Sequence, residues 1–215
     1  MATMDVEARE LTAVDLADRF GPIPLRRIVL DPPPGEATEE DLVDLHERTR
    51  RVYELVDGIL LEKPVGLYES WLAGRILGKI NQYLEEHRLG FAAGEAGMLK
   101  LVEGLVRAPD VSYIAWSKTP DRRVPKQPVP QLVPDLAVEV LGRANTKQEI
   151  DRKLDDYFEA GVQLVWIIDP KTRTARVYAS REQPTTLTTT DSLDGGGVLP
   201  GLTLKLAELF ADAES

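Results

Sequence analysis

One stretch of the sequence limits the possible folds most, an apolar strand candidate that encloses a single glutamate. Residues 136–141, LAVEVL, form a hydrophobic run of the kind found in strands that are covered on both faces. Glu139 is the only charged residue in this run. A carboxylate removed from water without partners costs several kcal/mol. Glu139 is therefore protonated, paired with a cation, or facing a cation in a cleft, and the last option is the functional one.

The segment after this strand predicts a helix that carries a lysine close to Glu139. Its apolar positions recur at helical spacing, and Gly161 follows as a stop signal; they are Ile150, Leu154, Tyr157 and Phe158. At roughly 100° per residue, Lys153 lies about 60° from Ile150, at the edge of the buried stripe. We expect its ammonium to reach back toward the end of the strand. The alternative is that Lys153 points to solvent or pairs with Glu149, one helical turn earlier.

Composition excludes several classes of site. The chain has 215 residues, of which 43% are hydrophobic and 29% charged, which is typical of a globular protein with one sizeable core. Because cysteine is absent, disulfides, thiolate zinc sites and cysteine nucleophiles are excluded. His46 and His87 have no metal-binding spacing. The N-terminus lacks the basic start and apolar core of a signal peptide, and no apolar run is long enough to span a membrane, so we expect a cytoplasmic protein.

The net charge of −10 argues against strong non-specific binding of nucleic acid, which depends mainly on neutralisation of phosphates by Lys and Arg. Local basic patches still matter. Three basic islands occur, at residues 118–126, 26–27 and 48–51. In each of them, solvated loop charges are the favoured interpretation.

Hydrophobic periods and turn signals predict an alternation of helices and strands. Residues 1–20 read as a short amphipathic helix, and the proline-rich residues 21–35 as an extended arm over the body. Thr38 begins a helix, with Asp41 three residues later as a capping box. Further elements are a hairpin at 51–62 with Asp57-Gly58 at its turn, a helix at 67–87, strands within 89–107, at 112–116, 163–169, 174–179 and 185–190, and a helix at 205–210.

Three more acids are candidates for the same site. Glu69 projects into the apolar stripe of the 67–87 helix, although a first-turn glutamate also favours the helix dipole while facing water. Asp110, after Pro109, enters a mostly apolar strand, although Asp beside Pro is commonly a turn or cap residue. Glu54 is a further candidate for a functional role, although a solvated position on an edge strand is the favoured interpretation. Asp169, beside Pro170, is most simply a turn residue.

Glu69, Asp110, Glu139 and Lys153 together provide three carboxylates and one amine on elements that can all point inward. Oxygen ligands suit Mg²⁺ or Mn²⁺, and a nearby lysine can stabilise developing charge on a phosphoryl group. The reaction class that this indicates is phosphodiester hydrolysis. Buried acids and a lysine also form purely structural ion pairs, so spacing alone leaves that alternative open.

The sequence resembles a known family. Its strings YELVDG (53–58), GLYES (66–70), LVRAPDVSYIAW (105–116), PDLAVEVL (134–141), RKLDDYFEAGVQLVWIIDP (152–170), RVY (176–178) and LDGGGVLPGLTLKLAELF (193–210) are similar to the Uma-two family of restriction-endonuclease-like proteins, a branch of the PD-(D/E)XK nuclease superfamily. The likeness covers about residues 38–211. It implies an α/β (α+β) fold with a mixed sheet, a restriction-endonuclease-like α/β/α core at 38–211, and an N-terminal helical and proline-rich extension at 1–37.

The resemblance also implies roles for the candidate residues. Pro109-Asp110 corresponds to the PD element of the superfamily and Glu139 to its second acid, and these two would hold Mg²⁺ or Mn²⁺. Glu69 would be the acid on the preceding helix. Leu141 stands where the E-x-K motif has its lysine, and Lys153 on the following helix is the expected replacement.

The function implied is a metal-dependent endonuclease that acts on DNA, with a homodimer as the expected assembly because enzymes that cut both strands usually present two sites about a two-fold axis. The apolar residues of the N-terminal arm are a candidate clasp for that dimer. The alternative is a nuclease-like fold used as a binding or assembly module without turnover, which the acidic net charge and Leu141 favour.

Overall fold

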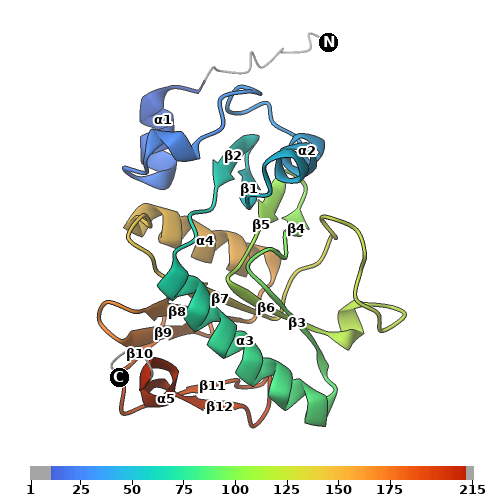
Figure 1. Ribbon diagram of the computed structural model, residues 1–215, viewed down its shortest axis with the longest axis vertical. Coiled ribbons are helices and arrows are strands. Elements are labelled where there is room, and N and C mark those ends of the chain that lie inside the picture. The colour runs from blue at the N-terminus through green and yellow to red at the C-terminus, as the bar shows by residue number, and fades with distance from the viewer. Residues whose placement is uncertain (1–10, 212–215) are drawn as a thin grey trace, which may run out of the picture.

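The computed structural model describes residues 11–211 (Figure 1). The helices in that range are α1 (Ala13–Phe20), η1 (Leu25–Arg27), α2 (Glu39–Thr49), α3 (Leu67–His87), η2 (Trp116–Lys118), α4 (Lys147–Ala160) and α5 (Leu206–Phe210). The strands are β1 (Tyr53–Val56), β2 (Ile59–Glu62), β3 (Gly90–Gly94), β4 (Leu99–Val102), β5 (Leu105–Arg107), β6 (Val111–Ala115), β7 (Leu136–Val140), β8 (Leu164–Asp169), β9 (Thr174–Tyr178), β10 (Pro184–Leu187), β11 (Ser192–Asp194) and β12 (Thr203–Lys205).

The main sheet is mixed and has the strand order β10-β9-β8-β7-β6-β3. The strands β7 and β8 are parallel and are joined through α4, whereas the other neighbours are antiparallel. The apolar strand around Glu139 is therefore an interior strand of this sheet. The predicted mixed sheet is confirmed.

Helices cover both faces of the main sheet. Since side chains alternate along a strand, each strand contributes residues to both of these layers. From β7, Leu136, Val138 and Val140 join the apolar cluster of α3, which crosses one face of the sheet in Figure 1. Ala137 joins the cluster of α4 on the other face. Glu139 is two residues beyond Ala137 and so shares the face of α4.

A second, antiparallel sheet has the order β2-β1-β5-β4. Its β1–β2 hairpin closes on Asp57 and Gly58 with positive φ angles of 50° and 72°, as the Asp-Gly pair predicts. The chain passes from this sheet into the main one through residues 108–110, between β5 and β6. Asp110 therefore lies at the junction of the two sheets.

The N-terminal segment packs onto the body beside α4. The helix predicted over residues 1–20 is α1, whose first turn contains the capping box of Thr12 and Asp15; residues 1–10 lie outside the described range. Phe20, Ile23 and Ile28 then join the apolar cluster of α4, so the proline-rich arm does wrap over the body. The predicted capping box of Thr38 and Asp41 is present at the start of α2.

Near the C-terminal end, β11 and β12 form a two-stranded sheet, and α5 packs against α3. The threonine-rich strand β10 ends at Leu187, three residues earlier than predicted. The reason is a turn in which Thr188 donates hydrogen bonds to Asp191 through its backbone nitrogen and its hydroxyl. Among the described helices, none has the length and apolar character needed to cross a membrane.

Candidate active site

A cleft of about 1200 Å³ opens where the C-terminal end of β7 meets the first turn of α3 and the loop that leads into α4. It contains all four residues that the sequence indicated: Glu69, Asp110, Glu139 and Lys153 all line it. Three of them, Asp110, Glu139 and Lys153, are less than 9% exposed. The fold therefore brings the predicted acids and the predicted lysine into one concave, largely buried site.

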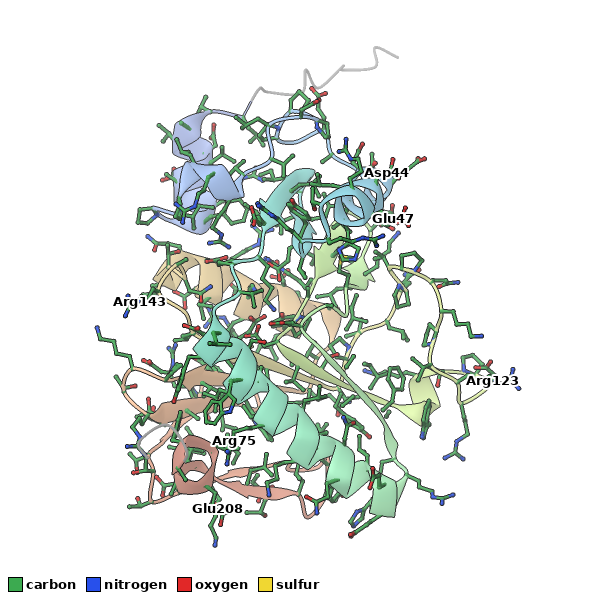
Figure 2. All side chains as sticks on the ribbon, in the orientation of Figure 1. Asp44, Glu47, Arg75, Arg123, Arg143 and Glu208 are labelled. Carbon is green, nitrogen blue, oxygen red and sulfur yellow. The ribbon has the colours of Figure 1, made fainter. Side chains whose placement is uncertain are left out.

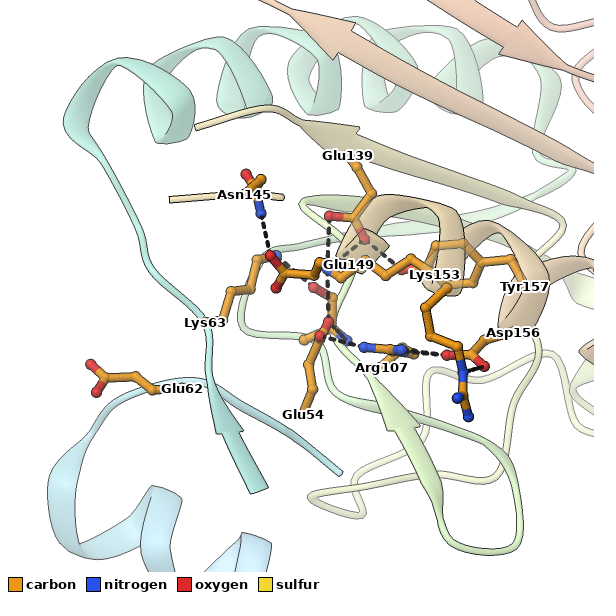
Figure 3. Close-up of polar contacts among 12 residues, drawn as sticks. Glu54, Glu62, Lys63, Arg107, Glu139, Asn145, Glu149, Lys153, Asp156 and Tyr157 are labelled. Carbon is orange, nitrogen blue, oxygen red and sulfur yellow. Dashed lines mark hydrogen bonds and ion pairs between the residues drawn. The ribbon is translucent and has the colours of Figure 1, made fainter. Parts of the chain in front are cut away.

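Lys153 contacts Glu139 directly. Its Nζ donates to both carboxylate oxygens at 3.0 Å, and the hydroxyl of Tyr157 donates to Oε1 at 2.5 Å (Figure 3). Both donors are on the face of α4 that covers β7. The predicted reach of Lys153 toward the strand is confirmed. The alternative pairing of Lys153 with Glu149 is wrong, because Glu149 binds Arg27.

Glu54 shares Lys153 with Glu139. Its Oε1 lies 3.0 Å from the lysine Nζ and accepts from the backbone nitrogen of Ala108 at 3.2 Å, while its Oε2 accepts from Arg107 at 2.8 Å. Glu54 is only 2% exposed, so the expected solvated edge-strand residue is wrong. The strand β1 lies between β2 and β5, and Glu54 follows the same alternation as the buried Val56. The placement of Glu54 on the same face of the strand as Val56 was the signal in the sequence that could have predicted its burial.

Arg107 extends the network away from the cleft. It is 1% exposed and forms ion pairs with Glu54 and with Asp156 of α4 (Figure 3). Arg152 holds the second oxygen of Asp156 at 2.9 Å. Neither Arg107 nor Asp156 was singled out from the sequence. Their role is to fix the position of Glu54, and through it that of Lys153.

Asp110 is held at the same end of β7 as Glu139. Its Oδ2 accepts from the backbone nitrogen of Val140, the residue after Glu139, at 2.5 Å. Its Oδ1 pairs with Lys63 at 2.7 Å. Lys63 follows β2 and also donates to the carbonyl of Ala108 at 2.5 Å. Lys63 was missed because it follows the hairpin, in a segment with no helical or strand period.

Glu69 reaches the cleft from the first turn of α3. It is partly exposed, and its carboxylate lies between two glycines. A Cβ placed on Gly66 would lie 2.0 Å from Oε2, and one on Gly142 would lie 3.4 Å from Oε1. A side chain on Gly66 would therefore displace the carboxylate of Glu69, whereas one on Gly142 would make only an ordinary contact with it. Glu69 lies at the open end of the helix stripe, beside the loop that follows β7, and not within the apolar layer.

Burial and neighbouring charges affect the two acids around Lys153 differently. Burial raises the pKa of Glu139, and the nearby Lys153 and Lys63 only partly oppose this. Burial also disfavours ionised Glu54, but the charges of Lys153 and Arg107 outweigh it and lower the pKa of Glu54. Burial disfavours the charged form of Lys153, yet Glu139 and Glu54 raise its pKa above the ordinary value. Glu139 is therefore the acid of this pair that protonates first.

One of the basic islands is structural. Arg27 is 4% exposed, and its guanidinium donates to both carboxylate oxygens of Glu149, at 3.1 and 2.5 Å. It also donates to the backbone carbonyls of Glu62 and Ala144. The expected solvated charge is wrong for Arg27. This residue ties the N-terminal arm to α4 and to the loop that borders the cleft.

Comparison with known proteins identifies the family of this chain. Residues 39–207 match the family model described as "Uma2: Putative restriction endonuclease". The chain belongs to the Uma2 family. Among solved structures it is similar to a crystal structure of "a putative nuclease belonging to DUF820" from Anabaena variabilis, with a TM-score of 0.67 and 20% sequence identity. That match covers 76% of this chain and 92% of the other. A search of curated proteins found no match.

The donor set of this Uma2 protein fits a hard divalent cation. Mg²⁺ is typically bound through one or two carboxylates, with water and substrate phosphate completing its shell. Within residues 11–211, no group of three or more acidic or histidine side chains is arranged to hold a metal. Asp110 and Glu139 nevertheless lie at one end of β7, and Asp110 already binds one cationic group, the ammonium of Lys63 at 2.7 Å. Two carboxylates with oxygen donors are what such a site requires.

Basic side chains surround the mouth of the cleft. They are Arg143, Lys147, Lys171 and Arg176. Lys147 pairs with Asp151, whereas the structure shows no carboxylate partner for the other three within the described residues. Figure 2 shows Arg143 at the surface, beside the start of α3. The cleft thus combines buried acids with basic side chains at its rim, and four half-buried acids also line it: Glu69, Glu95, Asp151 and Asp169.

Proposed function

We propose that this Uma2 protein is a metal-dependent endonuclease that hydrolyses phosphodiester bonds in DNA. One observation carries the proposal: two carboxylates, Asp110 and Glu139, lie at the same end of β7 in one cleft, with the ammonium of Lys153 against one of them. This is the chemistry that phosphoryl transfer needs, because catalysis of that reaction consists largely of positioning and charge stabilisation.

Each residue has a distinct role in this proposal. Asp110 and Glu139 would hold Mg²⁺ or Mn²⁺, which when bound polarises the phosphoryl oxygen and acidifies water. Lys153 keeps Glu139 oriented and provides positive charge beside the scissile phosphate. Glu69, at the cleft mouth, assists by orienting the attacking water. Glu54 and Arg107 position Lys153 without touching the substrate.

The rim supports a nucleic acid as the substrate. Because the whole chain carries a net charge of −10, any binding of phosphate must come from a local patch. Arg143, Lys171 and Arg176 provide such a patch around the cleft. Tyr68, 37% exposed on the first turn of α3, also lines the cleft and offers an aromatic face on which a base can stack.

The fold supports the same proposal at the level of architecture. A restriction-endonuclease-like core would contain a mixed sheet of the kind that lies between α3 and α4, and we propose that this core spans residues 38–211, with residues 1–37 as an extension. The buried pair of Arg27 and Glu149 gives that extension a structural purpose, because it braces the loop beside the cleft.

We further propose that the protein acts as a homodimer joined through the arm. Ile23 and Ile28, two of the candidate clasp residues, are buried in the core of their own chain. Leu25 and Leu30 are 74% and 72% exposed. These two leucines are therefore the part of the arm that remains for a two-fold contact.

The test is cleavage of single-stranded and duplex DNA, with RNA in parallel, in the presence of Mg²⁺, Mn²⁺ or a chelator. We expect cleavage that needs the metal and is abolished in Asp110→Asn and Glu139→Gln. Asp169→Asn is a matched control, because Asp169 lines the cleft but caps a turn by accepting from Lys171 and Thr172. Equal cleavage by Asp110→Asn and the wild type would refute the site.

The second candidate function is a nuclease-fold binding module without turnover. Its support is that Glu54, Asp110 and Glu139 are already paired with lysine or arginine, so the network is satisfied by protein groups alone. Leu141, which stands where the E-x-K motif has its lysine, also favours a function without turnover. Tight binding of DNA without cleavage, unchanged in Asp110→Ala, would decide for this function.

A further inference from the structure

Lys63 is a cation at the candidate metal site that the roles assigned above do not use. It stands between β2 and α3, and its side chain is 7% exposed. Its Nζ lies 2.7 Å from Asp110 Oδ1 and donates to the carbonyl of Ala108 at 2.5 Å. It also lines the cleft. Figure 3 shows Lys63 beside the network that links Glu54, Lys153 and Glu139.

This contact occupies the carboxylate that a metal ion would need. The other oxygen of Asp110 accepts from the backbone nitrogen of Val140, so both oxygens are engaged. An ion bound to Asp110 would lie against the ammonium of Lys63, and two like charges would share one carboxylate. Metal binding and the contact between Lys63 and Asp110 therefore oppose each other.

The two lysines of the site differ in their freedom to move. Lys153 is 2% exposed and is held by both Glu139 and Glu54, and its helix α4 packs on the sheet. Lys63 belongs to a non-helical connection, and Pro64 and Val65 after it are exposed. Its flexible four-carbon side chain can turn from Asp110 into the cleft without moving a helix or strand.

We propose that Lys63 is an internal counter-ion that competes with the divalent cation for Asp110, and that a phosphodiester in the cleft draws Lys63 away and so admits the metal. The inference rests on the proposed function and adds a coupling to it. Metal and nucleic acid then bind cooperatively, and by linkage each raises the affinity for the other by the same factor. The contact between Lys63 and Asp110 thus keeps the affinity for the metal low until the nucleic acid is bound.

The experiment measures Mn²⁺ affinity by titration calorimetry, with and without a phosphorothioate thymidine oligonucleotide that resists hydrolysis. For the wild type we expect weak binding alone and binding about tenfold or more tighter with the oligonucleotide. In Lys63→Met we expect tight Mn²⁺ binding without the oligonucleotide and little further gain with it. A merely structural lysine would not produce tighter metal binding on removal.

Two further variants keep the test decisive. Lys118→Met is the matched control, because Lys118 pairs with the buried Asp135 at 2.9 Å outside the cleft and should leave Mn²⁺ affinity unchanged. Lys63→Gln keeps a hydrogen-bond donor for Asp110 without the charge, and serves if Lys63→Met does not fold. Equal Mn²⁺ affinity in wild type and both Lys63 variants would overturn the coupling alone. Absence of Mn²⁺ binding in every variant would overturn the metal site as well.

Discussion

Lys153 places its ammonium 3.0 Å from both carboxylate oxygens of Glu139, across the interface between α4 and β7. The two residues are 14 positions apart, and the turn between strand and helix brings them face to face. The same ammonium is 3.0 Å from Glu54 of the second sheet. One lysine thus joins the helix to both sheets at the floor of the cleft.

The first prediction concerns Lys153→Met. We expect cleavage to fall by about 10² or more, because a positive charge beside the phosphate is lost. Folding should also weaken by about 3–5 kcal/mol, since two buried carboxylates lose a shared partner. Lys153 is only 2% exposed, so water cannot replace its charge beside the two carboxylates. Urea unfolding and a cleavage assay measure the two effects.

A double variant separates stability from catalysis at Lys153. Glu54→Gln combined with Lys153→Met removes one negative charge together with the positive one, so part of the lost stability should return. Cleavage should stay low in the double variant. Recovery of both stability and cleavage would mean that Lys153 only supports the fold.

The pH profile of cleavage forms the second prediction. Because burial raises the pKa of Glu139 above its ordinary value of 4.5, the loss of activity on acidification should occur above that value. Glu54 contributes to this raised pKa, and it competes for Lys153. Glu54→Gln should therefore move the acid limb of log(kcat/KM) to lower pH. An unmoved limb would show that Glu139 is not the titrating group.

The same raised pKa has a consequence for folding. A group that binds its proton more tightly in the folded state contributes stability below its unfolded pKa and loses that contribution as the pH rises through its folded pKa. For Glu139 the window therefore begins at 4.5 and extends upward. Glu139→Gln should gain stability relative to the wild type on going from acid to neutral pH. Chemical unfolding at several pH values measures this difference, and a constant difference would contradict the raised pKa.

Local patterns in the sequence were enough to place part of the site. The run around Glu139 and the helical stripe after it put Lys153 near the strand, and Asp-Gly at 57–58 predicted the hairpin. These inferences depend on neighbours a few residues apart, where backbone geometry is regular.

The rest of the site depends on contacts between distant segments. Arg107 meets Glu54 across 53 positions, and Arg27 meets Glu149 across 122. Hydrophobic periodicity does not predict such pairs, because a charged residue gives the same pattern whether it contacts water or a buried counter-ion. Only the alternation of Glu54 with Val56 carried a local hint of burial.

The third prediction tests the buried arginine beneath the site. Arg107→Met should lower the free energy of unfolding by about 3–5 kcal/mol, because Glu54 and Asp156 are left buried with fewer partners. The matched control is Arg51→Met, whose ion pair with Glu62 is solvent-exposed and should cost less than about 1 kcal/mol. Both are measured by urea unfolding followed by circular dichroism. Similar costs for the two variants would contradict the network.

The fourth prediction concerns the assembly. We expect light scattering to give the mass of a dimer, and Leu25→Ser with Leu30→Ser to shift it to that of one chain, because these exposed leucines supply the apolar contact. The substitutions spare the core, unlike deletion of the arm, which would remove Ile23 and Arg27 from their buried contacts. A wild-type mass of one chain at all concentrations would exclude the dimer.

The most direct test of the central claim is anomalous scattering from crystals of the wild type grown with Mn²⁺ and the phosphorothioate oligonucleotide. The account predicts an anomalous peak between the carboxylates of Asp110 and Glu139, with Lys153 still on Glu139 and Lys63 turned away from Asp110. The absence of such a peak at saturating Mn²⁺, with Lys63 still bound to Asp110, would contradict it.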